Sequence, residues 1–101
     1  MIESMDELQA RVNGQLNRLL DLQDAMVAVR MRETSPDGAI TVEVDGNGGL
    51  VDLELGTPVS RMSPEEFERV LVDTCATAAG RVFAERSRLV VDFNDEMATG
   101  K

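Results

Sequence analysis

The chain has 101 residues, of which 43% are hydrophobic and 3% aromatic, and its formal net charge is −9. This length fits one small domain, with a core built from Leu, Val, Met and Ala. Nineteen acidic residues against ten basic ones repel polyanions at long range and argue against a bulk electrostatic grip on nucleic acid. With no histidine and one cysteine, Cys75, the sequence offers no intramolecular disulfide and no set of metal ligands, so we expect no metal or cofactor.

A long amphipathic helix is predicted first, over about residues 3–31. The range contains no proline, and Ser4 followed by Glu7 has the spacing of a capping box. Apolar residues recur at steps of three and four, as they do in coiled coils. We expect this seam to form a dimer interface through Met5, Leu8, Val12, Leu19, Leu22 and Met26.

Three short strands are predicted next, over about residues 29–56. The segments "AITVEVD" (39–45) and "LVDLELG" (50–56) alternate apolar and polar residues, and a glycine-rich turn between them is typical of a hairpin. "VRMRETS" (29–35) is a candidate for the remaining strand. We expect a three-stranded antiparallel meander with one polar face.

A second long helix is predicted over about residues 64–97. Ser63 is the expected N-cap, Pro64 occupies the first helical position, and Glu66 completes a capping box. Two helices of about 28–34 residues would each be about 42–50 Å long. A compact domain of this size has a radius of gyration of only about 13 Å, so apolar helix surface must be left for a partner. We therefore expect a homodimer, formed either through an intermolecular helix pair or through a sheet joined across the two-fold axis; the alternative is a monomer with helices broken at Gly14 and Gly80.

Catalytic chemistry is not indicated. Asp92, Asp95 and Glu96 lie in a polar stretch near the end of the chain, where a solvated helix face is expected rather than a catalytic pair. The glycines of "DGNGG" (45–49) are not followed by Lys-Ser or Lys-Thr and do not open a helix, so they form a hairpin turn rather than a phosphate loop. The sequence predicts no catalytic residues and a non-enzymatic protein.

The arginines occur in pairs at helical spacing. Arg11 and Arg18 share one face of the first predicted helix, and Arg81 and Arg88 share one face of the second. Such side chains can contact phosphates. They can also form ion pairs within the helix, and the acids close to them in sequence are Asp21, Asp24, Glu85 and Asp92.

The expected location is the cytoplasm. The opening segment "MIESMDELQA" is acidic and does not have the basic and apolar regions of a secretory signal. No apolar run approaches the length of a membrane span, so no membrane association is expected.

The segment "GAITVEVDGNGGLVDLEL" (38–55), set between two long helices, resembles the YbaB/EbfC family of bacterial nucleoid-associated proteins. The matching positions extend over roughly residues 3–95 and centre on Gly38, Val42, Val44, Gly46, Val51 and Leu53. The resemblance implies an α+β fold with residues 1–101 as one domain, a tweezer-like homodimer, and double-stranded DNA of the nucleoid as the partner. The DNA-binding candidates it implies are Arg11, Arg18, Arg81 and Arg88.

A second interpretation keeps the fold and changes the partner. If the helix ends are the tips of the tweezers, those tips carry Glu3, Asp6, Glu7, Asp92, Asp95 and Glu96, which repel phosphate. The acidic, arginine-over-lysine composition also resembles divergent actinobacterial members of the family, some associated with type VII secretion, which look like adaptors or chaperones. A continuous cationic strip would favour DNA, whereas arginines each paired with a neighbouring acid would favour an unidentified protein partner.

Overall fold

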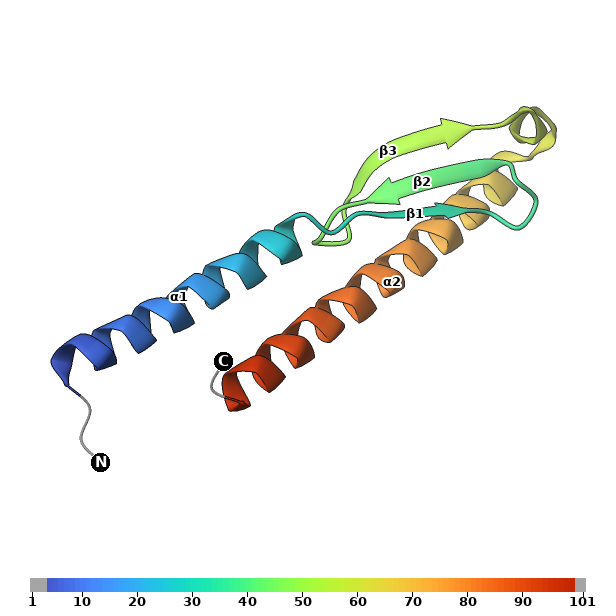
Figure 1. Ribbon diagram of the computed structural model, residues 1–101. Coiled ribbons are helices and arrows are strands. Elements are labelled where there is room, and N and C mark those ends of the chain that lie inside the picture. Colours follow the sequence, from blue (N-terminus) through green and yellow to red (C-terminus); the bar gives the residue numbers. More distant parts are fainter. Residues whose placement is uncertain (1–3, 100–101) are drawn as a thin grey trace.

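The computed structural model describes residues 4–99 and has the predicted α+β architecture. Two helices run from one small sheet toward the same end of the molecule, where α1 begins and α2 ends (Figure 1). The elements in chain order are α1 (Met5–Val27), β1 (Met31–Thr34), β2 (Ile40–Val44), β3 (Leu50–Leu55), the 3₁₀ helix η1 (Thr57–Arg61) and α2 (Pro64–Ala98).

The molecule is elongated. Its radius of gyration is 20.5 Å and its extents are 71 × 18 × 16 Å, whereas a compact chain of this length would have a radius near 13 Å. Gly14 and Gly80 both lie inside continuous helices, so the alternative of broken helices is wrong. No residue of α1 is buried. The long helices therefore leave apolar surface uncovered, as their lengths predicted.

The first helix is shorter than predicted at its C-terminal end. Its start follows the expected cap, because Ser4 Oγ accepts a hydrogen bond from the Glu7 amide at 3.1 Å; the predicted first residue, Glu3, lies outside the described residues. The helix ends at Val27, and Val29 turns into the core, where it is 8% exposed. The Arg30 guanidinium donates to the carbonyl oxygens of Val27 and Val29 at 3.1 and 2.8 Å. The bond to Val27 satisfies a carbonyl that the end of the helix leaves without a partner, and the bond to Val29 lies in the link that follows the C-cap.

The second helix builds the core with β1 and β2. Ser63 Oγ accepts from the Glu66 amide at 3.1 Å, which confirms the predicted cap. The face of α2 that carries Ala78 and Val82 packs against the sheet, opposite the inward side chains of β2. Full burial of one such aliphatic side chain contributes about 1.5–3 kcal/mol. The largest fully buried side chains are Ile40, Val42, Val44 and Val82.

The sheet is the predicted antiparallel meander, in the order β1-β2-β3. A register shift beside Val44 places Leu50, rather than Val51, opposite that residue. β3 lies beyond the reach of α2, and every one of its residues is exposed. Leu53 and Leu55 face the same side as the buried residues of β2, yet they are 38% and 53% exposed. β3 is thus an apolar edge strand whose inner face residues 4–99 leave largely uncovered.

The hairpin turn uses two glycines for different reasons. Gly48 has a φ of +81°, a conformation that side chains disfavour. A Cβ atom at Gly46 would overlap the carbonyl oxygen of Met26, so glycine allows the turn to lie against the end of α1. The hairpin turn and the C-terminal end of α1, which we call the root of α1, are therefore in direct backbone contact.

Two turn aspartates make stability depend on pH. Ser35 Oγ and the Ala39 amide donate to Asp37 at 2.6 and 3.0 Å, and these bonds lower the pKa of Asp37. Amides of the hairpin turn, Gly49 first, lower the pKa of Asp45 in the same way. Because the folded-state pKa values lie below the unfolded value of about 3.9, this stabilisation is present above about pH 4 and is lost as the pH falls through the folded-state values.

We therefore expect the melting temperature of the wild-type protein to fall as the pH is lowered from 5 to 2. The variant Asp37→Asn/Asp45→Asn should show a shallower fall, because it lacks the two carboxylates whose protonation is linked to unfolding. Circular dichroism melts at each pH measure both curves. Parallel curves for the two proteins would mean that other carboxylates dominate acid unfolding.

Candidate DNA-contacting helices

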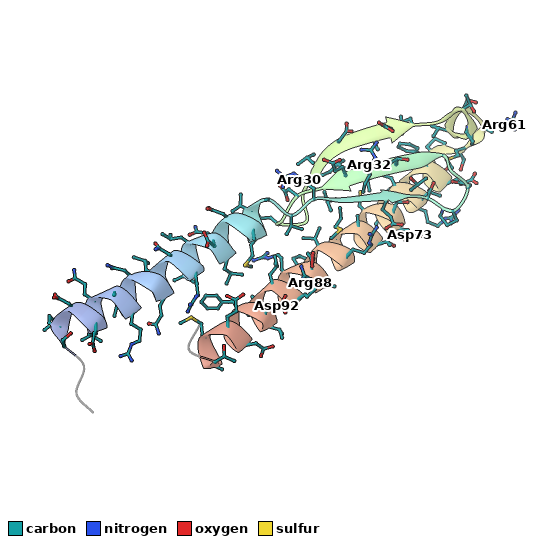
Figure 2. The ribbon with its side chains drawn as sticks, in the orientation of Figure 1. Arg30, Arg32, Arg61, Asp73, Arg88 and Asp92 are labelled. Atoms are coloured by element: carbon teal, nitrogen blue, oxygen red, sulfur yellow. The ribbon has the colours of Figure 1, made fainter. Side chains whose placement is uncertain are left out.

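The α2 arginine pair is held by carboxylates. Arg88 Nη1 lies 2.8 Å from Asp92 Oδ2, and the same guanidinium donates through Nε and Nη2 to Glu85. Figure 2 shows Arg88 and Asp92 next to each other along α2. Arg81 Nη1 donates to Glu33 Oε2 of β1 at 2.8 Å and to the Arg32 carbonyl oxygen at 3.1 Å. Ion pairing within the helix was predicted for Arg88, whereas the bond between Arg81 and β1 was not.

These α2 ion pairs lie at the surface. The side chains of Arg81 and Arg88 are 54% and 58% exposed. The hydrogen bond from Arg88 lowers the pKa of the Glu85 carboxyl, so the pair is fully ionised near neutral pH. The geometry holds both guanidiniums in place without removing them from solvent.

Arg81 and Arg88 occupy one flank of α2, and apolar side chains occupy another. The bonds from Arg81 to Arg32 and Glu33 place the arginine flank on the β1 side of the helix. Phe83, two residues further on, approaches the hairpin turn at Gly48 and is 50% exposed. At 100° per residue these two directions differ by about 200°. A partner on the apolar flank would therefore leave the arginine flank accessible.

Arg18 of α1 differs from the α2 arginines. It is half-buried, and no carboxylate of residues 4–99 forms an ion pair with it. Arg11 is exposed and lies on the same side of the helix, one heptad away. The structure thus places the four candidate arginines on two separate helices, and both arginines of α2 are paired with acids.

The predicted seam of α1 divides into two parts. Met5, Leu8, Val12 and Leu19 are exposed, by 75%, 39%, 50% and 49% respectively. Leu22 and Met26 are half-buried and line a groove of about 510 Å³ at the root of the helix, beside the hairpin turn. The outer part of the seam therefore makes no core within this chain.

The root groove carries two arginines whose roles the sequence did not indicate. Arg86 Nη1 donates to the Gly46 carbonyl oxygen at 3.1 Å, and Arg30 binds the carbonyls at the end of α1. The Arg86 bond therefore joins α2 to the hairpin turn, whereas the Arg30 bonds are local to the end of α1. No local pattern predicts the Arg86 contact, which joins residues 40 apart in the sequence.

The polar face of the sheet is organised around Arg32. Its guanidinium lies 3.3 Å from Glu43, 3.5 Å from Asp52 and 2.7 Å from Glu54, so it joins all three strands. The hydrogen bond and charge of Glu54 raise the pKa of Arg32. The two-residue alternation predicts that these side chains share a face, and the strand register brings them together. We interpret this cluster as structural, because its carboxylates outnumber the one cation.

Clusters of metal ligands and membrane-spanning helices are both absent from the described residues. Within residues 4–99, no three His, Cys, Asp or Glu side chains are grouped so that they could hold a metal ion. No helix in this range has the length and hydropathy to cross a membrane.

The comparisons agree with the architecture. No curated protein matches the chain. The crystal structure of an uncharacterized protein from Helicobacter pylori, HP0035, has the same fold with a TM-score of 0.67. The likeness covers 90% of this chain and 97% of that one at 19% sequence identity. The family model of the YbaB/EbfC DNA-binding family matches residues 1–96, and the chain belongs to this family.

Proposed function

We propose that this protein is a non-enzymatic, nucleoid-associated protein of the cytoplasm that binds double-stranded DNA as a homodimer. The observation that carries the proposal is the match of a DNA-binding family over residues 1–96. In this proposal the phosphate-contacting residues are Arg11, Arg18, Arg81 and Arg88. Arginine suits this role because its planar guanidinium can donate two parallel hydrogen bonds to a phosphate.

The net charge of −9 is compatible with this proposal if the contacts are local. Exposed ion pairs such as those of Arg81 and Arg88 contribute little to stability, because water and salt screen them. A DNA phosphate can therefore replace a carboxylate as the partner of an exposed guanidinium. Long-range repulsion remains, so we expect weak binding that is strongest at low salt.

The homodimer in this proposal covers the inner face of β3. Leu50, Leu53 and Leu55 form an apolar strip along that face, and Phe83 extends it across α2. Exposed apolar strips of this kind mark interaction surfaces in proteins. A second copy can cover the strip on both chains at once, as a two-fold axis requires. The outer seam of α1, from Met5 to Leu19, is the second candidate interface.

Binding of a labelled random-sequence DNA duplex, measured across a salt titration, tests the function. We expect the affinity to fall steeply as salt rises, with a log–log slope that reports the number of phosphates neutralised. Arg18→Ala should weaken binding and reduce that slope by about one. Arg61→Ala is the matched control, because Arg61 lies in η1 at the opposite end of the molecule (Figure 2). No binding at low salt, or equal losses in both variants, would contradict the proposed DNA contacts.

A protein partner is the second candidate, and the ion-paired arginines are the observation that favours it. Arg32, Arg81 and Arg88 each hold at least one carboxylate, so the described arginines do not form one uninterrupted cationic strip. In that case the exposed apolar surfaces of α1 and β3 would bind an unidentified protein. A dimer that binds no duplex at low salt would support this candidate over the first.

A further inference from the structure

We infer that three carboxylates control the access of DNA to the α2 arginines. These are Glu33 of β1 and Glu85 and Asp92 of α2, which we call the carboxylate clamp. The inference rests on the proposed DNA-binding function and adds its regulation. In the free protein the clamp occupies Arg81 and Arg88: a phosphate must displace a carboxylate to bind Arg88 through two hydrogen bonds, and it must compete with the charge of Glu33 at Arg81.

The clamp engages all three nitrogens of the Arg88 guanidinium. Glu85 accepts from Nε and Nη2, and Asp92 accepts from Nη1 at 2.8 Å. A phosphate that binds the guanidinium through two parallel hydrogen bonds needs one of its edges. Glu85 holds the edge formed by Nε and Nη2, and Asp92 holds Nη1 of the other edge. A phosphate that binds either edge through two hydrogen bonds must therefore displace at least one carboxylate.

Glu33 of β1 holds one nitrogen of the Arg81 guanidinium. The Oε2 atom of Glu33 accepts from Nη1 at 2.8 Å, and the Arg32 carbonyl shares that nitrogen. The Glu33 side chain is 25% exposed, whereas that of Arg81 is 54% exposed. A phosphate can therefore approach Arg81 from solvent while the less exposed carboxylate holds it from the protein side.

The clamp opposes DNA in two ways. Each carboxylate competes for guanidinium hydrogen bonds, and each also repels a phosphate brought within a few ångströms of it. Arg18 has no such carboxylate partner among residues 4–99, so its contact with phosphate needs no exchange. Arg18 and the two α2 arginines should consequently respond differently when the clamp carboxylates are neutralised.

The test compares two double variants in the full-length protein. Glu85→Gln/Asp92→Asn removes two clamp charges at Arg88, and Asp95→Asn/Glu96→Gln removes two charges one turn away on α2. The side chains of Asp95 and Glu96 form no ion pair within the described residues, so the second variant frees no arginine. Affinity for the random-sequence duplex is measured against salt for both variants and the wild type, after circular dichroism shows equal helix content.

We expect the clamp variant to bind duplex about three- to tenfold more tightly than the wild type at low salt, with a slope steeper by about one. The control variant should gain less and keep the wild-type slope, because it changes only the net charge. Adding Arg88→Ala to the clamp variant should abolish the extra gain. Binding by the clamp variant where the wild type shows none would also support the clamp.

Other results would overturn the inference. Equal gains in the two double variants would show a general charge effect and no clamp. Wild-type binding with no gain in the clamp variant would reject the clamp and leave the DNA-binding function standing. No binding by any of the variants would reject both, and that pattern is distinct from the loss of the clamp alone.

Discussion

Leu53→Glu is expected to convert the proposed homodimer into monomers at micromolar concentration. Leu53 lies in the middle of the apolar strip of β3 and is 38% exposed in the single chain. In the dimer a glutamate there would be an unpaired charge at the centre of the interface. Such a charge costs about 3 kcal/mol or more, which corresponds to a loss of at least about 100-fold in affinity between the protomers. Sedimentation velocity over a concentration series measures the change.

Two further variants make this test decisive between the two candidate interfaces. Asp52→Asn is the control on β3, because Asp52 belongs to the polar face with Arg32 and its change should leave the dimer intact. Val12→Glu places the same new charge on the exposed seam of α1, where Val12 is 50% exposed. A dimer that survives Leu53→Glu and dissociates with Val12→Glu would assign the interface to α1. Survival of the dimer in both variants would contradict both assignments.

The parts of the fold that the sequence predicted are those set by short-range hydrogen bonds and by periodicity. Ser4 and Ser63 cap their helices through amides three residues later, so the complete signal lies within one turn. The β2 alternation likewise predicts which residues enter the core without knowledge of the partner strand.

The end of α1 shows what periodicity misses. Apolar residues continue at helical spacing through Val29, and this pattern predicted a helix to residue 31. Val29 instead fills the core beside the sheet, and Arg30 donates to the Val27 carbonyl that the shortened helix leaves without a partner. The free energy gained by packing outweighs the helical propensity of about four residues. That gain depends on the position of the whole sheet, which no local pattern contains.

The candidate site was predictable only where its contacts are local in the sequence. The arginine pairs and the bonds of Arg88 within α2 follow from spacing, since Glu85 and Asp92 lie three and four residues away. The partner of Arg81 lies 48 residues earlier, on β1. Its identity depends on how α2 crosses the sheet, and only the folded structure shows it.

Gly46→Ala is expected to destabilise the protein by about 2 kcal/mol or more, because the new Cβ would overlap the Met26 carbonyl oxygen and neither backbone can yield alone. Gly46 does not have a positive φ, so the cost comes from contact with α1 and not from the turn conformation. The displaced turn would also move the Gly46 carbonyl that Arg86 holds at 3.1 Å. Thermal melts at equal protein concentration measure the loss, since a dimer's stability depends on concentration.

Gly14→Ala is the matched control for Gly46→Ala. A Cβ at Gly14 meets nothing within 4 Å, and alanine in a helix interior is favoured over glycine by about 1 kcal/mol. The same chemical change should therefore stabilise the protein at one glycine and destabilise it at the other. Equal effects at both positions would mean that the contact between the hairpin turn and the C-terminal end of α1 does not fix the position of that helix. In that case the direction of the α1 arginines would not be fixed by the fold, and DNA binding could not depend on their alignment with those of α2.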